Sequence, residues 1–370
     1  MQVLLDKEKE DFKKKIESFI STNLKDKDIN LKSLWQNLYK EKFINDKNSF
    51  SQNVLLTEAL CKFKPGLGLF LLTQFTCIEI IKNFASEFLK EKYLNKLISG
   101  EYISCFSITE PNAGSDVSMI ETFAEKKGNN WTLNGHKIWA SNGSISDIII
   151  TFAQTVKAIH ELPQHKDKSG ITSFVISSKC KEVEILKDTP KLGVETTPSN
   201  EVFIKNLVVN EECQIGNIGD GIKIALSTIT LGRIFCAAQA VGLLSGVLEE
   251  AVKHSTKRNQ FGKSISDYQA IKWYIADMTK DLDAARLLLY KAAWTKENAP
   301  EELNKLSSMA KYFCTSVAQK HSSNAVQIFG GAGLIKDSYV ACAYRDSKVL
   351  EIYEGTNEIQ KLVIAREILR

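Results

Sequence analysis

A glutamate near the end of the chain is the first residue whose setting suggests chemistry. Glu354 stands in the segment Tyr353-Glu354-Gly355-Thr356-Asn357, where an aromatic residue and a glycine turn precede a new helical pattern. Thr356 or Asn357 can cap that helix through a side-chain oxygen. An apolar turn disfavours the charged carboxylate and raises its pKa, which suits Glu354 to act as a general base. The same pattern also fits an ordinary exposed glutamate in a turn.

A loop that follows a predicted strand offers hydrogen-bond donors to a ligand. The segment from Phe106 to Asp116 contains the hydroxyl groups of Thr109 and Ser115 and the open backbone around Gly114. Such a loop could hold the polar edge of a flat ring or a phosphate. A plain surface turn is the alternative interpretation.

Two shorter motifs could also contact a ligand. Trp139 stands two residues before Ser141 at the end of a predicted strand, where an indole can stack on a ring while a hydroxyl bonds to it. A tryptophan in the core is the alternative. Arg258 opens the string Arg-Asn-Gln-Phe-Gly-Lys, which either ends a helix at Gly262 or presents the arginine to a phosphate.

The glycine-rich segments do not match a dinucleotide-binding fingerprint. Residues 327–333 (QIFGGAG) lie between helical patterns and allow close approach of the backbone to a ligand, but no strand precedes them. Residues 216–221 fail the same test. The five histidines lack the spacing of a metal site, and neither a Gly-x-Ser-x-Gly turn nor a phosphate-binding loop occurs. The sequence therefore predicts no metal.

Three stretches with different hydrophobic patterns position these residues. Residues 1–104 have helical periodicity, residues 105–212 alternate short β-rich runs with turns, and residues 213–370 return to a helical period. The middle stretch is typical of a small barrel or sandwich. The segment from Ile222 to Ser255 is apolar on most sides, as in the centre of a bundle. The expected fold is α+β and mainly α: a helical N-terminal domain, a middle β domain and a C-terminal helical bundle.

The Asn134-Gly135 pair between two apolar runs predicts a β-hairpin over residues 131–139. The expected strands cover residues 102–108, 119–126, 130–134, 147–154, 171–177, 181–187 and 201–207. The expected C-terminal helices cover residues 222–255, 266–296, 301–328, 336–347 and 357–369.

Charge and composition argue against several classes of function. The 48 Lys and Arg residues exceed the 44 Asp and Glu residues by +4, which is too weak and too evenly spread for a nucleic-acid-binding protein. No uninterrupted apolar run approaches the about 20 residues of a membrane span, and the N-terminus lacks the pattern of a secretory signal. The eight cysteines form no CxxC pair, so reduced thiols and a cytoplasmic protein are expected.

Taken together, the motifs resemble the acyl-CoA dehydrogenase family of flavoproteins. Two signatures carry the resemblance: CFSITEPNAGSD at residues 105–116, and QIFGGAGL with YRDSKVLEIYEGTNEIQ within residues 327–360. The stretches YLNKLISGEY, LNGHKIWASNG, LGR and RNQFGKSISDYQAIK match at the expected spacings. The resemblance extends over residues 84–370, about three quarters of the chain.

The resemblance implies an FAD site between the β domain and a C-terminal four-helix bundle. The cofactor-binding residues that it implies are Phe106, Ile108, Thr109, Gly114, Ser115, Trp139, Ser141, Arg258, Phe261, Gln327, Gly330, Gly331 and Thr356. On the side of the substrate and its pantetheine arm it implies Ser115, Arg233, Tyr353, Gly355 and Arg366. Family members often complete one flavin site from two subunits, which implies a homodimer or homotetramer.

In this family a thioester substrate gives an α-proton to a glutamate and a β-hydride to flavin N5. The resemblance assigns the base to Glu354, and it directs the backbone N–H of Glu354 and a flavin ribityl hydroxyl at the thioester carbonyl. Some relatives place the base one residue before the arginine of the middle helix, where this chain has Gly232. The implied partners are an acyl-CoA or a phosphopantetheine-bound acyl thioester, and an electron-transfer flavoprotein or O2 as electron acceptor.

Two departures from the family pattern leave the substrate open. Lys64-Pro-Gly-Leu-Gly68 is the nearest match to a usual glycine-rich turn, and Thr230 stands where one branch has an aspartate that contacts pantetheine. The alternative partner is therefore an acyl carrier protein, as in compact members that oxidise carrier-bound groups in secondary-metabolite biosynthesis. A non-redox scaffold of the same fold is a further alternative, which a colourless protein would indicate.

Overall fold

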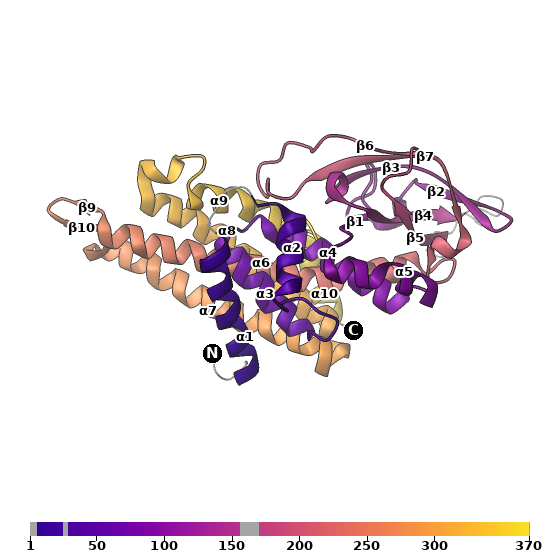
Figure 1. Ribbon diagram of the computed structural model, residues 1–370. Coiled ribbons are helices and arrows are strands. Elements are labelled where there is room, and N and C mark those ends of the chain that lie inside the picture. Colours follow the sequence, from indigo (N-terminus) through magenta and orange to yellow (C-terminus); the bar gives the residue numbers. More distant parts are fainter. Residues whose placement is uncertain (1–5, 25–28, 156–169, 370) are drawn as a thin grey trace.

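The computed structural model describes residues 6–24, 29–155 and 170–369. Its N-terminal part is helical (Figure 1), with α1 (Lys7–Asn23), α2 (Leu31–Lys40), α3 (Phe50–Phe63), α4 (Leu67–Phe84) and α5 (Glu87–Ser99). Side chains of Asp6, Asn30, Ser49 and Ser86 accept hydrogen bonds from backbone N–H groups at the starts of α1, α2, α3 and α5. These caps explain why the helices begin where they do.

The described middle residues form an eight-stranded sheet. Its strands are β1 (Ser104–Ser107), β2 (Phe123–Lys127), β3 (Asn130–Ser141), β4 (Ile148–Thr155), β5 (Ile171–Ser177), β6 (Val183–Ile185), β7 (Ser199–Asn210) and β8 (Gln214–Ile215). The order along the sheet is β6-β7-β3-β1-β4-β5-β8, and β2 pairs with both β3 and β4. Both β1 and β2 therefore lie between β3 and β4, and they pair with different parts of these two strands.

The hairpin expected around Asn134-Gly135 is wrong. The β3 strand continues through both residues and pairs with β7 along its length, with a shift of register between Leu133 and Gly135. The chain reverses instead at Gly128-Asn129, between β2 and β3, where Gly128 has a φ of 61°. Asn134 accepts a hydrogen bond from the Asn206 backbone N–H across the irregularity, so tertiary pairing overrides the local turn preference.

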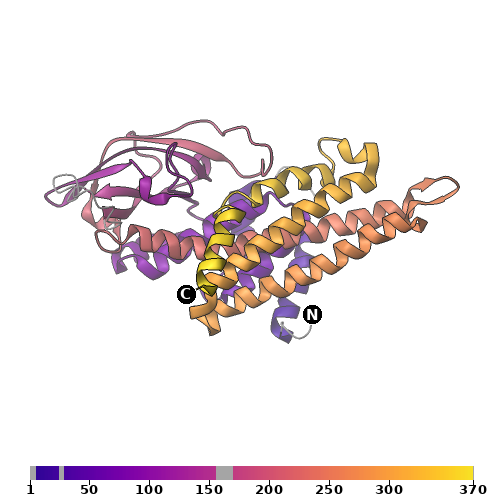
Figure 2. The same ribbon diagram turned by 180° about the vertical axis from the view of Figure 1, so that it is seen from behind.

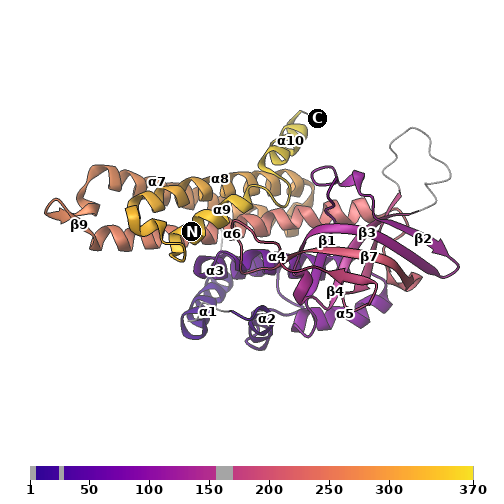
Figure 3. The same ribbon diagram turned by 90° about the horizontal axis from the view of Figure 1, so that it is seen from above.

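The C-terminal part is built on α6 (Gly221–Lys257), which runs through the middle of the molecule (Figure 3). It packs against α3 and α4 on one side and against α7 (Gln269–Asn298) and α8 (Leu303–Phe329) on the other. The shorter helices α9 (Tyr339–Leu350) and α10 (Asn357–Ile368) complete the layer seen from behind in Figure 2. The helical bundle expected for this part of the chain is confirmed.

Two apolar cores hold the fold together. The larger core joins the N-terminal helices to the bundle, for example where the ring of Phe75 stacks on Phe235 with centroids 5.1 Å apart. The smaller core fills the sheet around Trp131 and Phe174, whose rings meet edge to face at 5.4 Å. Because α4 and α6 belong to the larger core, the helical parts on either side of α6 form one packed body.

Within the described residues, two helices are long and apolar enough for a membrane span by length and composition alone, namely α4 and α6. The length of uninterrupted apolar runs in the sequence indicated neither helix as a membrane span. Within the fold, 78% of the α4 window and 89% of the α6 window are buried, as in core helices of a soluble bundle. The two windows are therefore weak signs of a membrane protein.

Candidate active site

A cavity of about 590 Å³ lies where the sheet meets the bundle. Its walls come from α4, from the loop after β1, from the end of β3, from the segment before β7, from α6 and from the turn between α9 and α10. The lining is mainly apolar with hydroxyl groups between the apolar side chains. Lining residues that the sequence singled out are Phe106, Ile108, Thr109, Gly114, Ser115, Trp139, Ser141, Tyr353, Glu354, Gly355 and Thr356.

Glu354 is partly buried in this cavity and sits in a strained backbone conformation. Its φ is 56°, which a residue with a side chain adopts only when its surroundings enforce it. Burial raises the pKa of Glu354 to about 7, although the positive charges of Arg233 and Lys311 oppose the shift. Its carboxylate lies against Gly232 of α6, where an added Cβ would overlap Oε2. Its position in the cavity and its raised pKa suit Glu354 to accept a proton away from bulk water.

The turn that carries Glu354 is fixed from three sides. The Tyr353 hydroxyl donates a hydrogen bond to the buried side chain of Gln239 on α6. Gln360 on α10 donates from its amide to the carbonyls of Glu354 and Gly355, at 3.2 and 2.9 Å. Of the two residues that the sequence offered as caps, Thr356 caps α10 by accepting from the Ile359 backbone N–H at 3.3 Å.

The end of β3 brings an exposed aromatic ring to the cavity. Trp139 has a φ of 56° and keeps 54% of its surface exposed, which is unusual for the largest side chain. It lies in a β-bulge, because the pairing of β3 with β7 shifts between Lys137 and Ala140. The Ile138 backbone N–H donates to the carbonyl of Thr109 at 2.9 Å, which ties this bulge to the loop after β1.

Arg233 and Arg366 do not line the cavity. Arg233 is 5% exposed, and its guanidinium donates to Asn304 and Ser308 of α8 at 2.9 and 3.1 Å. Burial lowers the pKa of Arg233 to about 10, with Glu354 opposing the shift. Arg366 is exposed on α10. Direct contact of either arginine with substrate remains a prediction.

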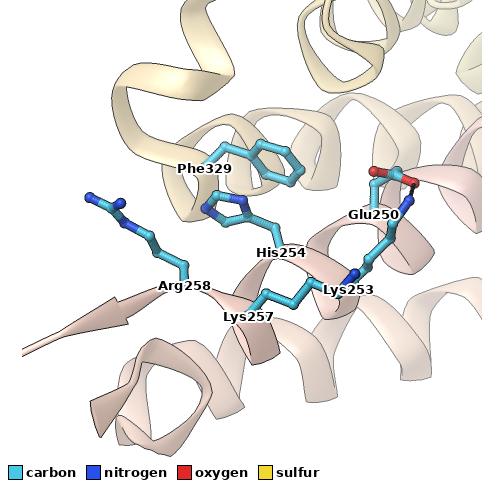
Figure 4. A pocket seen from close by; sticks show the side chains of 6 residues that line it. All are labelled: Glu250, Lys253, His254, Lys257, Arg258 and Phe329. Atoms are coloured by element: carbon cyan, nitrogen blue, oxygen red, sulfur yellow. Dashed lines mark hydrogen bonds and ion pairs between the residues drawn. The ribbon is translucent and has the colours of Figure 1, made fainter. Parts of the chain in front are cut away.

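A second group of expected cofactor residues lies far from this cavity, at the other end of the bundle. Arg258 lines a shallow hollow of about 350 Å³ (Figure 4), where the ring of His254 stacks on Phe329 at 4.1 Å. Phe261 is 94% exposed, with a φ of 52°. The exposed residues Gln327, Gly330 and Gly331 stand nearby at the end of α8.

The two groups cannot meet in one protomer. Thr228 lines the cavity and Arg258 ends the same straight helix about 30 residues later. At a rise of 1.5 Å per residue, the two positions are about 45 Å apart. One chain therefore does not bring Arg258, Phe261, Gln327, Gly330 and Gly331 to the cavity that its own Glu354 lines.

Several cavity residues were not found from the sequence. They lie on α4 and in the segment before β7: Leu69, Leu72, Thr73, Thr76, Pro190, Lys191, Leu192 and Val194. The apolar run that begins α4 reads only as core, and the segment before β7 has no motif. Val194, a β-branched residue at a φ of 51°, is a genuine backbone outlier that no single sequence reveals.

Comparison with known proteins explains this arrangement. Residues 105–207 match the family model of the acyl-CoA dehydrogenase middle domain, and residues 219–369 match that of the acyl-CoA dehydrogenase C-terminal domain. The structure of butyryl-CoA dehydrogenase from Megasphaera elsdenii superposes with a TM-score of 0.90 at 34% identity, and 99% of each chain is covered.

The chain belongs to the acyl-CoA dehydrogenase family.

Two further relatives differ in what their names describe. The prolyl acyl carrier protein oxidase AnaB matches with a TM-score of 0.90 at 27% identity, covering 98% of this chain and 99% of that one. The subunit CarC of the caffeyl-CoA reductase-Etf complex from Acetobacterium woodii is 36% identical over 76% of this chain and 72% of its own length. The family thus includes proteins named for both coenzyme A and carrier-protein substrates.

As a family member, the protein is an oxidoreductase that acts on the CH–CH group of an acyl thioester with FAD as cofactor. The cavity fits that cofactor on its own geometry. Trp139 offers an exposed ring, and Ser141 adds a hydroxyl close by. Around Gly114, no atom lies within 4 Å of a Cβ placed there, so the backbone is open to close approach. Phe106, Ile108, Thr109, Ser115 and Thr356 complete the set of residues that would hold the flavin end in this cavity.

Proposed function

We propose that Glu354 is the base that removes the α-proton of the acyl thioester. The observation that carries this proposal is the position of its carboxylate: it lies in the cavity, against Gly232, with its pKa raised to about 7 by burial. A base with a pKa near neutrality combines a large deprotonated fraction with useful proton affinity. Gly232 cannot serve as a base, so the second position that family members use is closed here.

A hydrogen-bond donor to the thioester carbonyl makes the α-proton more acidic, and the backbone N–H of Glu354 can act as such a donor. Among the described residues, the Glu354 N–H has no hydrogen-bond partner in the protein, although the turn around it is fixed by Tyr353 and Gln360. We propose that this N–H donates to the thioester carbonyl and stabilises the negative charge that develops when the α-proton leaves. Bound FAD supplies the acceptor for the β-hydride. The turn therefore holds the proton acceptor and an oxyanion donor in one rigid unit.

For the substrate, we propose a short acyl-CoA thioester, with a carrier-protein-bound acyl group as the second candidate. Butyryl-CoA dehydrogenase is more similar in sequence than AnaB, at 34% against 27% identity with equal TM-scores. Thr230, in place of the aspartate seen in one family branch, favours the second candidate. The name of CarC favours an electron-transfer flavoprotein over O2 as the redox partner.

We further propose that the protein is at least a homodimer, in which each flavin site is completed by the partner. The distance of about 45 Å between Thr228 and Arg258 supports this arrangement. Exposed apolar side chains at the same end of the bundle support it too, since Phe261, Leu334 and Ile335 are 94%, 76% and 62% exposed.

The decisive experiment is anaerobic bleaching of the flavin with a panel of CoA and carrier-protein thioesters. The wild-type protein should be yellow and should bleach with one class of thioester. The rate should rise with pH, be half-maximal near pH 7 and level off about one pH unit higher, because Glu354 must be deprotonated. The Glu354→Gln variant should keep FAD and lose about 10²-fold or more of the bleaching rate.

Bleaching of Glu354→Gln at the wild-type rate would remove the glutamate from the mechanism. A colourless protein that cannot be reconstituted with FAD would indicate the non-redox scaffold instead. Reoxidation by an electron-transfer flavoprotein under anaerobic conditions, or only after admission of air, distinguishes the two electron acceptors.

A further inference from the structure

The middle sheet contains a gap where the chain leaves it to form the cavity loop. The β1 strand pairs with β4 as far as Thr151, and the pairing of β2 with β4 begins at Gln154. Between them the chain makes the excursion of residues 108–122, which carries Ile108, Thr109 and Gly114 to the cavity. Carbonyls at the edge of this gap have lost the strand that would otherwise satisfy them.

A buried lysine fills the gap. Lys137 on β3 is 0% exposed, and its ammonium group donates three hydrogen bonds inside the sheet. The acceptors are the Phe152 carbonyl of β4 at 2.7 Å, the Ile108 carbonyl at 3.3 Å and the Glu110 carboxylate at 2.6 Å. All three N–H donors of the ammonium are thereby used. One side chain replaces the missing strand and holds both edges of the gap.

Glu110 extends this clamp to the far end of the loop. Besides Lys137, its carboxylate accepts from the backbone N–H groups of Glu121 and Thr122, the latter at 3.0 Å. Burial alone would raise the pKa of Glu110, but the charge of Lys137 and the hydrogen bonds from Lys137, Thr122 and Glu121 together outweigh burial and lower the pKa. Burial lowers the pKa of Lys137 to about 8, so both groups are charged at neutral pH. The pair anchors the two ends of the excursion to one point.

The clamp is joined through short backbone segments to residues that line the cavity. Lys137 and Trp139 are two residues apart on β3, and the register shift of the bulge begins after Lys137. The Ile138 N–H that joins the bulge to Thr109 lies between them. Any movement of the Lys137 ammonium would thus shift Thr109 and Trp139 together.

We infer that Lys137 is a positioning residue of the flavin site, which holds the loop 108–115 and the Trp139 bulge in one arrangement around the cofactor. The inference rests on the proposed use of this cavity for FAD. Lys137 does not line the cavity itself and acts through the loop and the bulge. Removing its ammonium leaves the Ile108 and Phe152 carbonyls and Glu110 without their shared donor.

The test compares FAD binding in Lys137→Met, Glu110→Gln and wild type, with the full-length protein. Lys137→Met keeps a long apolar side chain but removes every donor. We expect its FAD dissociation constant to rise at least about tenfold, since several hydrogen bonds to a charged group are lost. The absorption bands and the midpoint potential of the remaining bound flavin should shift as well, which a loss of stability alone would not cause.

Glu58→Gln is the matched control, because Glu58 is an equally buried carboxylate in the helical core. It accepts from Tyr290 at 2.6 Å and from Arg286 at 2.9 Å and does not line the cavity. This variant should lower the melting temperature and leave the flavin spectrum and potential unchanged.

Unchanged FAD affinity, spectrum and potential in Lys137→Met would overturn the inference. If Lys137→Met does not fold, Glu110→Gln decides by the same measurements, because it keeps the size of the side chain and removes the charge that Lys137 meets. If the wild-type protein does not bind FAD at all, the result contradicts the proposed function itself. If the wild-type protein bleaches normally and the variants have the same FAD affinity, spectrum and potential, the result contradicts only the role of Lys137.

Discussion

Gly232 and Glu354 share one small volume, and this decides which residue can act as the base. A Cβ on Gly232 would overlap Oε2 of the glutamate, so a side chain at position 232 and the carboxylate of residue 354 exclude each other. Gly232 is also buried in the interior of α6, where glycine is about 1 kcal/mol less favourable than alanine. The helix retains a destabilising residue at the point where the carboxylate needs room.

Gly232→Ala should therefore impair flavin reduction without weakening the helix. The added methyl group displaces the Glu354 carboxylate, and we expect the rate of anaerobic bleaching by the preferred thioester to fall at least about tenfold while FAD stays bound. Stopped-flow absorbance at the flavin band measures both the rate and the bound fraction.

Gly246→Ala is the control on the same helix. A Cβ there would overlap the Tyr339 hydroxyl, in a contact between α6 and α9 that does not line the cavity. This variant should lower stability and keep the bleaching rate of the protein that remains folded. Equal bleaching rates for Gly232→Ala and wild type would show that the carboxylate does not need the space above Gly232.

At the scale of elements, α9 anchors the segment before β7 that covers one side of the cavity. Asp346 of α9 accepts from the Val194 backbone N–H at 2.5 Å, and the backbone of Gly193 packs so closely on Arg345 that a Cβ would overlap its carbonyl. Thr197 donates from its hydroxyl to the Gly66 carbonyl at 2.9 Å. These contacts hold Val194 in its strained conformation beside the cavity.

Asp346→Asn should stabilise the protein at neutral pH. Burial raises the pKa of Asp346 to about 6 from an ordinary 3.8, so the folded state binds the proton more tightly than the unfolded state. Stability then falls as pH rises from about 4 to 6, by about 3 kcal/mol in total. Asparagine avoids this cost and can still accept from Val194. The difference in melting temperature between variant and wild type should grow from pH 4 to 6 and then stay constant.

Asp281→Asn on α7 should behave in the opposite way. Burial alone would raise the pKa of Asp281, but hydrogen bonds from His321, Lys280 and Lys320 lower it. The carboxylate therefore stabilises the folded state above pH 4, and its replacement should cost stability there. A pH-independent difference for Asp346→Asn would mean that the Asp346 carboxyl has the same pKa in the folded and the unfolded chain.

At the scale of the whole molecule, the long bundle separates two halves of one expected cofactor site. The cavity with Glu354 lies near the start of α6, and Arg258 lies at its end. If two copies complete each other's sites, a chain that lacks Arg258 and a chain that lacks the Glu354 carboxylate carry complementary defects. In a mixed pair, the Arg258→Ala chain keeps its own Glu354 and receives Arg258 from the partner.

Mixed oligomers of Arg258→Ala and Glu354→Gln should therefore regain one intact site per pair. Each variant alone should bleach at least about 10²-fold more slowly than wild type, the first through loss of FAD and the second through loss of the base. Co-expression with two affinity tags isolates the mixed species, and anaerobic bleaching measures its activity. Light scattering should give at least twice the 41.4 kDa chain mass.

A mixed pair as inactive as its parents, or a wild-type protein that stays monomeric with FAD fully bound, would show that one chain completes its own site. Arg258→Lys in place of Ala should restore binding only in part, because lysine lacks the planar fork that grips a phosphate.

Much of the fold and of the candidate site could be predicted from the sequence because the residues that indicate them lie close together along the chain. The order of helical, β-rich and helical stretches follows from periodicity, and the turn around Glu354 follows from an aromatic residue, a glycine and a helix cap within five positions. The hairpin at Asn134-Gly135 was wrong for the complementary reason. Its local turn signal was real, but pairing of β3 with β7 over the full strand outweighs a two-residue preference.

Only the tertiary structure decided what depends on contacts between distant segments. The sequence shows Lys137 as one more lysine on a strand, whereas its role comes from Ile108, Glu110 and Phe152, which are 15 to 29 residues away. It also places Arg258 in a motif beside the flavin motifs, whereas the straight α6 carries it about 45 Å from the cavity. Residue types and spacing determine which chemistry is available, but burial, charge and distance are properties of the packed chain, and they decide which residues can take part in it.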